Sequence, residues 1–160
     1  MFALVSTTMI SCSKKSKDFY YETGGEIWFR NSEISLKFDK KMNCSIYYQN
    51  FNNSLNDVSD SANNINPSYY LEVNGEEVRD FSVDYNNIKV ETIETELGKG
   101  KRLILTGIAE KENKYKIEKE LVVELYNNYP DAAISYAMYK NTGDKELIID
   151  ADYSNCFQMN

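Results

Sequence analysis

A chain of 160 residues and 18.5 kDa is long enough for one domain with a short leader. Its 25 acidic and 18 basic side chains give a net charge of −7, which argues against nucleic-acid binding because phosphate contacts need a clustered cationic face. The chain contains no histidine, so Ser-His-Asp catalysis, Cys-His catalysis and His-ligated metal sites are excluded. The 13 Tyr, 7 Phe and 1 Trp supply material for a packed core. Composition therefore indicates a soluble globular domain.

An apolar run at residues 2–10 ends at Ser11 and Cys12, and a polar, basic stretch follows. Nine residues at 1.5 Å each cannot cross a hydrocarbon core of about 30 Å, so this run is not a transmembrane helix. It is typical of a secretory signal, and the cysteine after it resembles a bacterial lipobox, although Met9 stands where Leu is usual and no basic stretch precedes the run. We expect a signal peptide at residues 1–12, lipid on Cys12 and a spacer at residues 13–25. The alternative is an N-terminal strand.

The folded part is expected to begin at Gly24-Gly25, with two alternating strands at residues 27–30 and 33–38 around an Asn31-Ser32 turn. The same period of two continues over residues 42–48. Residues 50–68 are rich in Asn, Ser and Asp, which predicts a long exposed loop.

A strand is expected at residues 69–73, ending at Asn74-Gly75, the strongest hairpin signal in the chain. Both turn residues need positive φ, which Asn and Gly tolerate best. Further strands are expected at residues 78–85, 88–95 and 102–109, the last pair joined through Gly98 and Gly100.

Residues 111–126 fit two patterns. Ile117, Leu121 and Leu125 are spaced like one face of a helix, but the apolar residues of the segment also occupy mostly odd positions. The Val122-Val123 pair favours a strand through its stiff χ1 angles, and neither end carries a helix cap. We therefore predict one long strand.

The C-terminal part is expected to form a turn at residues 127–131, a strand at 132–140, a turn at 141–144 and a strand at 147–153. About ten short strands separated by frequent turns predict an all-β fold, an antiparallel β-sandwich. The expected domain is residues 26–160, without an internal repeat.

Two groups of acidic residues are candidates for chemistry. Glu118 and Glu120 share a strand face and are the residue type of a glycosidase pair, but a solvated face balanced by Lys116 and Lys119 explains them better. Asp57 and Asp60 offer oxygen ligands for Ca²⁺, yet they lack the spacing of a known calcium loop. We therefore expect no catalytic residue, metal or cofactor.

Five aromatic residues are candidates for stacking on sugar rings: Trp28, Tyr47, Tyr48, Tyr69 and Tyr70. Where two are adjacent in a strand, one ring points inward, and aromatic residues of β-sandwiches serve packing more often than binding. The cysteines after the leader, Cys44 and Cys156, are expected to be free and buried, the alternative being a disulfide.

The second half resembles a known family in three stretches. These are Gly98-Lys-Gly-Lys-Arg-Leu-Ile-Leu-Thr-Gly-Ile-Ala109, Tyr115-Lys-Ile-Glu-Lys-Glu-Leu-Val-Val-Glu-Leu-Tyr126 and Tyr129-Pro-Asp-Ala-Ala-Ile-Ser-Tyr-Ala-Met-Tyr-Lys-Asn141, followed by the strand at residues 146–153. Together they resemble the N-terminal β-supersandwich of family 36 glycoside hydrolases, the melibiase or α-galactosidase group. The residues that match its pattern maintain the fold: Glu118, Lys119, Tyr126, Pro130, Asp131, Asn141 and Gly143. The resemblance covers about residues 26–160.

The resemblance implies an accessory domain. Family members cleave terminal α-galactosides with two aspartates on a (β/α)₈ barrel that follows the sandwich, and such a barrel needs about 250 residues of its own. No residue here inherits either catalytic role. The expected function is therefore that of a sandwich domain, incomplete at its C-terminus and inactive alone, that packs on a catalytic barrel in cis or from a split gene.

Two other functions remain open. The chain is alternatively a stand-alone lipoprotein that binds a glycan or a protein through the loop at residues 50–68, so an oligosaccharide is a second expected partner. It is otherwise the sandwich of a neighbouring glycosidase family. For each, the expected location is the bacterial cell envelope, periplasmic or at the surface, with the lipid anchor as the only membrane contact.

Overall fold

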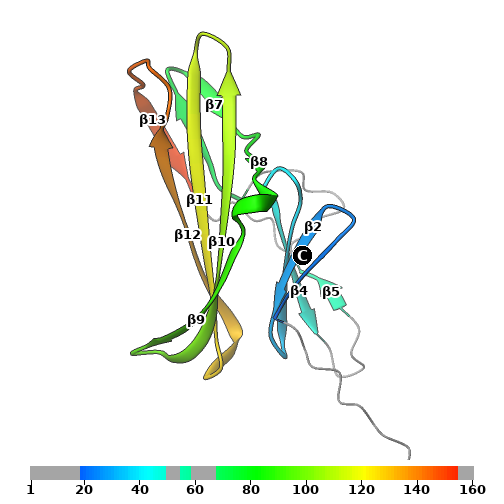
Figure 1. The fold of residues 1–160 in the computed structure, drawn as a ribbon. Helices are drawn as coiled ribbons and strands as arrows, with labels where there is room; N and C mark the ends of the chain where they lie inside the picture. The colour runs from blue at the N-terminus through cyan, green and yellow to red at the C-terminus, as the bar shows by residue number, and fades with distance from the viewer. Residues whose placement is uncertain (1–18, 50–54, 59–67, 155–160) are drawn as a thin grey trace, which may run out of the picture.

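The structure, a computed structural model, describes residues 19–49, 55–58 and 68–154 and is all-β. Figure 1 shows two main layers of antiparallel strands facing each other, which confirms the predicted β-sandwich. The described residues contain 13 strands rather than about ten, and one short 3₁₀ turn, η1 (Tyr85–Asn87). No helix of the described part is both long and apolar enough to span a membrane.

The first layer, sheet A, is a meander of five strands in chain order: β1 (Tyr20–Thr23), β2 (Glu26–Arg30), β3 (Ile34–Phe38), β4 (Cys44–Gln49) and β5 (Leu55–Asp57). The strand β1 was not predicted, and it lies in the segment expected to be a spacer. Gly24 and Gly25, with φ of 61° and 81°, form the turn between β1 and β2 instead of opening the fold. The predicted loop at residues 50–68 contains β5, and its other residues except Val58 and Ser68 lie outside the described part.

The second layer, sheet C, is built on three long strands: β10 (Gly98–Lys111), β11 (Tyr115–Tyr126) and β12 (Tyr129–Asn141). Two shorter strands, β8 (Ser82–Val83) and β9 (Lys89–Thr95), both pair with β10, at different points along its length. The prediction of a strand for the ambiguous segment is thus confirmed. The expected strand at residues 78–85 is broken into pieces, and residues 129–131 belong to β12 rather than to a turn.

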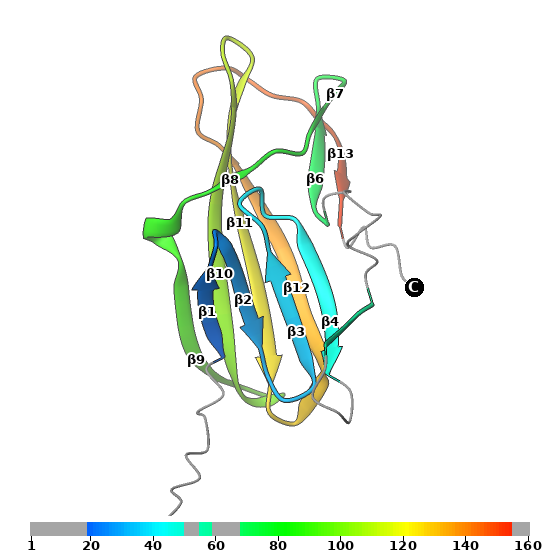
Figure 2. The same ribbon diagram turned by 90° about the vertical axis from the view of Figure 1, so that its right-hand side faces the viewer.

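A third, smaller sheet, sheet B, has the order β13 (Ile149–Tyr153), β6 (Tyr70–Val73) and β7 (Glu76–Val78). The predicted turn between β6 and β7 is confirmed, since Asn74 and Gly75 have φ of 50° and 73°. This turn is tied to the strand that lies beside it, because the Asn74 side chain accepts from the backbone N–H of Ile148 and the Gly75 N–H donates to Asp150. Sheet B lies beside the ends of the long strands where β10 turns into β11 (Figure 2).

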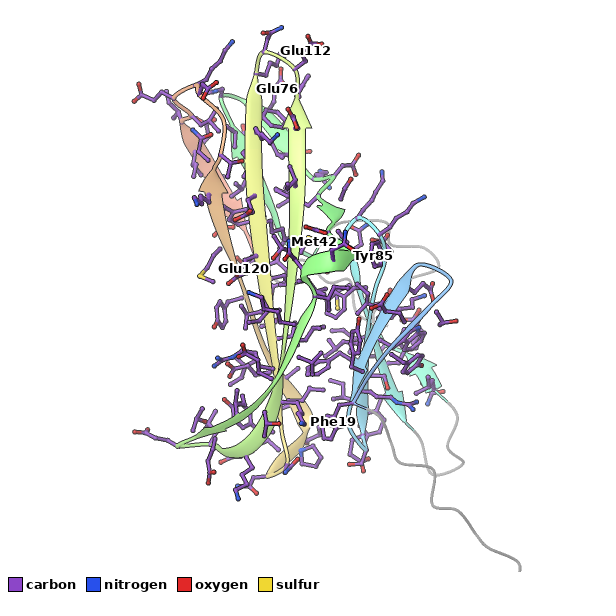
Figure 3. All side chains as sticks on the ribbon, in the orientation of Figure 1. Phe19, Met42, Glu76, Tyr85, Glu112 and Glu120 are labelled. Atoms are coloured by element: carbon purple, nitrogen blue, oxygen red, sulfur yellow. The ribbon has the colours of Figure 1, made fainter. Side chains whose placement is uncertain are left out.

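One hydrophobic core joins the three sheets. Its buried members come from sheet A, sheet B, the inward-facing odd positions of β10 and β11, and the segments that connect the strands, and they include Phe29, Phe38, Leu71, Leu121 and Leu125. Figure 3 shows side chains filling the space between the layers, with Met42 near β8 and β10. Met42 is fully buried and takes a φ of 63°, and its Sδ occupies the place that a Cβ on Gly107 would need. Gly107 therefore allows the layers to approach at this point.

Candidate binding surfaces

Three aromatic rings form a row on the outer face of sheet A. Tyr21 and Trp28 are opposite each other on β1 and β2, with ring centroids 5.9 Å apart and planes within 4°. Tyr47 on β4 reaches toward Trp28, with centroids 5.3 Å apart and planes tilted by 37°. We call these three residues the aromatic row. Each ring is partly exposed, and Figure 2 looks onto this face, where no described element lies in front of it.

The space between Trp28 and Tyr47 lies over β3. Ser35 of β3 pairs with Tyr47 in register, its flanking residues Ile34 and Leu36 belong to the core side, and Ser35 is nevertheless only 3% exposed. Side chains therefore lie across β3 and cover it. One side of the aromatic row therefore faces the sheet, and the other side faces solvent.

Two cations and one carboxylate border the aromatic row. The Arg30 guanidinium lies 4.9 Å from the centroid of Tyr21, and the Lys37 Nζ lies 5.8 Å and 5.5 Å from the centroids of Trp28 and Tyr47. Burial disfavours the charge on Lys37, but Tyr47 and the Glu26 carboxylate, 3.3 Å away, outweigh it, so the pKa of Lys37 is raised. Lys37 is therefore a charged hydrogen-bond donor at neutral pH.

The five predicted sugar-stacking residues separate in the structure. Trp28 and Tyr47 come together in the aromatic row, whereas Tyr69 is 1% exposed and belongs to the core. Tyr70 stacks on Tyr153 of sheet B with centroids 4.4 Å apart, and Tyr48, 42% exposed, pairs with Ile34 away from the row. Tyr21 was not predicted as a member of the row. The sequence signal that identifies it is the Gly24-Gly25 pair, a two-residue hairpin turn that places Tyr21 opposite Trp28.

A second surface lies on the outer face of sheet C. Its residues occupy neighbouring register positions, with Ile104 opposite Val122 and Val122 opposite Tyr136. The outer patch, as we call it, comprises Ile104, Ile108, Val122, Ile134, Tyr136 and Met138. Four of its members are 37–47% exposed, while Val122 is buried among them at 2%. Val122 joins Ile104 to Tyr136, with Ile134 and Met138 on either side of Tyr136 along β12, whereas Ile108 lies apart, opposite Glu118.

An ionic network borders the outer patch. Arg102 donates from Nε to Glu124 at 2.7 Å, and Tyr126 donates its hydroxyl to the other oxygen of Glu124 at 2.6 Å. Thr95 in turn donates to the Tyr126 hydroxyl at 3.2 Å, so β9, β10 and β11 are linked. The hydrogen bond to Glu124 raises the pKa of Arg102. The charges of Arg102 and Glu124 therefore compensate each other, and the network links β9, β10 and β11.

The paired acidic residues of β11, Glu118 and Glu120, lie on the outer face of sheet C. Glu118 and Glu120 lie with Met138 and Lys140 in a shallow hollow on the outer face, and Figure 3 shows Glu120 on β11. Lys116 binds Glu110 at 3.0 Å. The expectation that Lys119 also balances this face is wrong, because Lys119 occupies an odd position of β11 and points into the core.

Lys119 is buried, at 1% exposure, and its Nζ donates to the carbonyl oxygen of Tyr69 at 2.8 Å. The rings of Phe81 and Tyr69 lie beside it, with centroids 5.1 Å and 5.6 Å from Nζ. Burial lowers the pKa of Lys119 to about 8, an effect opposed by Cys44, Asp152 and Asp39. Lys119 links β11 to the start of sheet B and faces no open cleft.

Two hollows were not predicted. A cavity of about 150 Å³ lies between sheets A and C, lined mainly by apolar side chains, with the hydrogen-bonded hydroxyls of Tyr69 and Ser135 on its wall. An open depression of about 480 Å³ lies between the β10–β11 turn and residues 141–145. Its rim carries Lys111 and Lys114, which both bind Glu76 and lower the pKa of that carboxyl to about 2. These charges are already paired within the fold.

Metal and cysteine predictions are only partly covered by the structure. Among residues 19–49, 55–58 and 68–154, no three potential ligands gather to hold a metal ion. Asp57 is in β5, paired with Tyr47, while Asp60 lies outside the described residues. Cys44 packs against the core and has no disulfide partner among the described residues, and burial raises the pKa of its thiol. Cys12 and Cys156 also lie outside the described residues, so lipidation and pairing remain predictions.

Comparison of the chain with protein-family models, with curated proteins and with solved structures gives no match.

Proposed function

We propose that this chain is a non-catalytic β-sandwich module that packs against another protein domain through the outer patch. The observation that carries the proposal is the exposure of four large apolar side chains on one sheet face: Ile108, Ile134, Tyr136 and Met138, at 37–47%. Ile134, Tyr136 and Met138 lie at successive outward positions of β12, and Val122 of β11 lies between Tyr136 and Ile104 of β10, whereas Ile108 lies apart, opposite Glu118. Contiguous apolar areas of this kind mark interaction sites in soluble proteins.

The partner in this proposal is the catalytic (β/α)₈ barrel of an α-galactosidase-like glycoside hydrolase, in cis or from a split gene. The resemblance supplies this partner, and the chemistry of the described residues supports a non-catalytic role. Glu118 and Glu120 lie on the outer face, and the one strongly buried carboxylate of the network, Glu124, is held by Arg102 and Tyr126. A retaining pair must instead face a sugar site with about 5 to 5.5 Å between its carboxyl groups.

The test is the mass of the purified chain in solution, measured by light scattering on a Cys12→Ser variant that carries no lipid. We expect self-association, because the outer patch has no barrel to cover it. Ile134→Lys should shift the species toward the monomer. The matched control is Ile148→Lys, since Ile148 is 65% exposed but lies outside the patch, and it should leave association unchanged. A strictly monomeric chain would contradict the proposal.

The same preparation should not hydrolyse an aryl α-galactoside. Turnover that persists after removal of contaminating enzyme, and that co-purifies with the chain, would contradict the accessory-domain role. Addition of a barrel domain encoded beside the chain should suppress self-association, and Ile134→Lys should weaken that effect.

The second candidate is a stand-alone glycan- or protein-binding lipoprotein. The aromatic row favours it, since this surface carries three partly exposed rings on the face of sheet A that lies away from the core. Most of the loop at residues 50–68 lies outside the described residues. A monomeric chain would favour this candidate over the first.

A further inference from the structure

The hollow of about 150 Å³ between sheets A and C, which we call the inter-sheet cavity, is the most enclosed space in the described part of the molecule that carries apolar walls. Its lining comes from β3 and β4 of sheet A, from β11 and β12 of sheet C and from the residue before β6: Ile34, Leu36, Phe38, Cys44, Ile46, Leu121, Val123, Ala133, Ser135 and Tyr69. Protein interiors rarely leave voids larger than a water molecule, because atoms that face a void lose their dispersion contacts. A cavity of this size is therefore a candidate ligand site.

Small side chains keep one wall of the inter-sheet cavity open. Ala133 and Ser135 occupy successive inward positions of β12, which is the end strand of its sheet, and Cys44 begins β4 in the opposite sheet. These three residues, together with Ile34 and Ile46, are half-buried, whereas the other lining residues are buried. The wall that they form therefore lies nearest to solvent, and a small molecule can enter there without unfolding the chain.

The lining selects a neutral, mainly apolar ligand. The described residues that form it include no Asp, Glu, Lys or Arg, so a charged molecule would lose its hydration without meeting an opposite charge. The hydroxyls of Tyr69 and Ser135 lie on the wall, hydrogen-bonded to each other, and a hydroxyl can accept as well as donate. This pair can therefore meet one polar group of a ligand. An apolar cavity of about 150 Å³ accommodates a single benzene-sized ring.

We infer that the inter-sheet cavity is a binding site for a small neutral compound with one six-membered ring and one hydroxyl group, the class that contains phenol, p-cresol and cyclohexanol. The ring contacts Leu36, Leu121 and Val123, and the hydroxyl group hydrogen-bonds to the pair formed by Tyr69 and Ser135. The site does not depend on the barrel-docking proposal, because the cavity lies between the sheets and the outer patch lies on the outer face of sheet C.

Nuclear magnetic resonance tests the site on the full chain with Cys12→Ser, which carries no lipid. Phenol, p-cresol and cyclohexanol are titrated separately, and nuclear Overhauser effects between each compound and the methyl groups of the protein are recorded. We expect saturable binding with effects at Leu36, Leu121 and Val123, and none at Ile134 of the outer patch. Benzoate, which has the same ring with a negative charge, should bind about tenfold more weakly than phenol, or weaker still.

Three results of these titrations would overturn the inference. The first is the absence of saturable binding by all three compounds. The second is binding with effects at Ile134 and none at the methyl groups of the cavity. The third is an affinity for benzoate equal to that for phenol, because the lining could not then select a neutral ligand.

Variants test the cavity independently. Ala133→Leu should abolish binding, because the larger side chain extends into the space that Ala133 lines. The matched control is Ala132→Leu, the same change at an exposed, outward position of β12, and it should bind like the parent chain. Thermal unfolding identifies a variant that does not fold, and in that case the methyl effects in the parent chain still locate the site. A folded Ala133→Leu variant that binds like the parent would overturn the inference.

The role of the hydroxyl pair has its own test. Ser135→Ala should weaken the binding of phenol about fivefold, the effect of one lost hydrogen bond, and leave the binding of benzene nearly unchanged. Equal effects of this variant on phenol and benzene would overturn the assignment of a hydroxyl-bearing ligand.

Discussion

Lys119 was predicted to lie on the solvent-facing side of its strand, but it lies on the side that faces the core. It lies between two glutamates in a strand that alternates apolar and charged positions, yet its own position is one that points inward. Its long side chain crosses the core to reach the Tyr69 carbonyl, so the charge replaces the hydrogen bonds of water with one backbone acceptor and two ring faces. The cost of this exchange is visible in its pKa of about 8.

Stability should therefore depend on Lys119 in mildly alkaline solution. Its pKa is lowered on folding from 10.5 to about 8, so between these values the unfolded chain binds the proton more strongly and the free energy of unfolding rises with pH. We expect the wild type to gain about 3 kcal/mol relative to Lys119→Met between pH 8 and pH 10.5, measured by urea unfolding. The Cys44 thiol is present in both proteins, so its titration largely cancels. Lys116→Met, which removes an exposed ammonium, should run parallel to the wild type, and a parallel curve for Lys119→Met would contradict the argument.

At the scale of elements, the β6–β7 turn depends on backbone conformation rather than on packing. Gly75 has a φ of 73°, and a Cβ there would meet no atom within 4 Å. Gly75→Val should lower the free energy of unfolding by about 1 to 3 kcal/mol, because a β-branched residue is strained at positive φ. The control is Gly75→Asn, since Asn tolerates this region, and it should cost clearly less. Equal urea midpoints for both variants would show that the turn is not constrained.

The long strands depend on the Arg102 network in addition to their backbone ladder. Arg102→Met should leave the largely buried Glu124 with Tyr126 as its remaining side-chain donor, and we expect a loss of about 2 kcal/mol in the free energy of unfolding. Lys41→Met is the control, because Lys41 pairs with Asp80 where both side chains are largely exposed, at 48% and 72%, and such pairs contribute little. Thermal unfolding of the two variants measures the difference. Similar losses would mean that the burial of Glu124 does not matter.

At the scale of the whole molecule, the sandwich has two outer faces with different chemistry. Sheet A presents rings with donors and an acceptor, and sheet C presents an apolar patch bordered by an ion pair.

The proposed anchor belongs to the same scale. Cys12 ends an apolar run and begins a basic spacer, so we expect it to be diacylated. Metabolic labelling with palmitate in a bacterial host should mark the wild type and leave Cys12→Ser unlabelled. Cys44→Ser serves as the control, because Cys44 packs against the core, and it should be labelled like the wild type. Equal labelling of wild type and Cys12→Ser would contradict the lipoprotein assignment.

Local patterns determined the all-β class, most strands and the Asn74-Gly75 turn, because alternation with period two and turn chemistry act between near neighbours in sequence. The strand at residues 115–126 could be predicted for the same reason, although its spacing also fitted a helix. The strand β1 was missed, and the turn predicted at residues 127–131 occupies only residues 127–128, since strand ends depend on the pairing partner that tertiary structure provides.

The binding surfaces depended on the tertiary structure. Trp28 and Tyr47 could be proposed from the sequence, but only strand order places them on one face with Tyr21 and moves Tyr69 into the core. Likewise, alternation shows that Ile134, Tyr136 and Met138 share a face, but it does not show whether another sheet covers that face. Coverage depends on how the layers pack, and in this molecule sheets A and B share one core with the inward face of the long strands and leave the outer patch exposed.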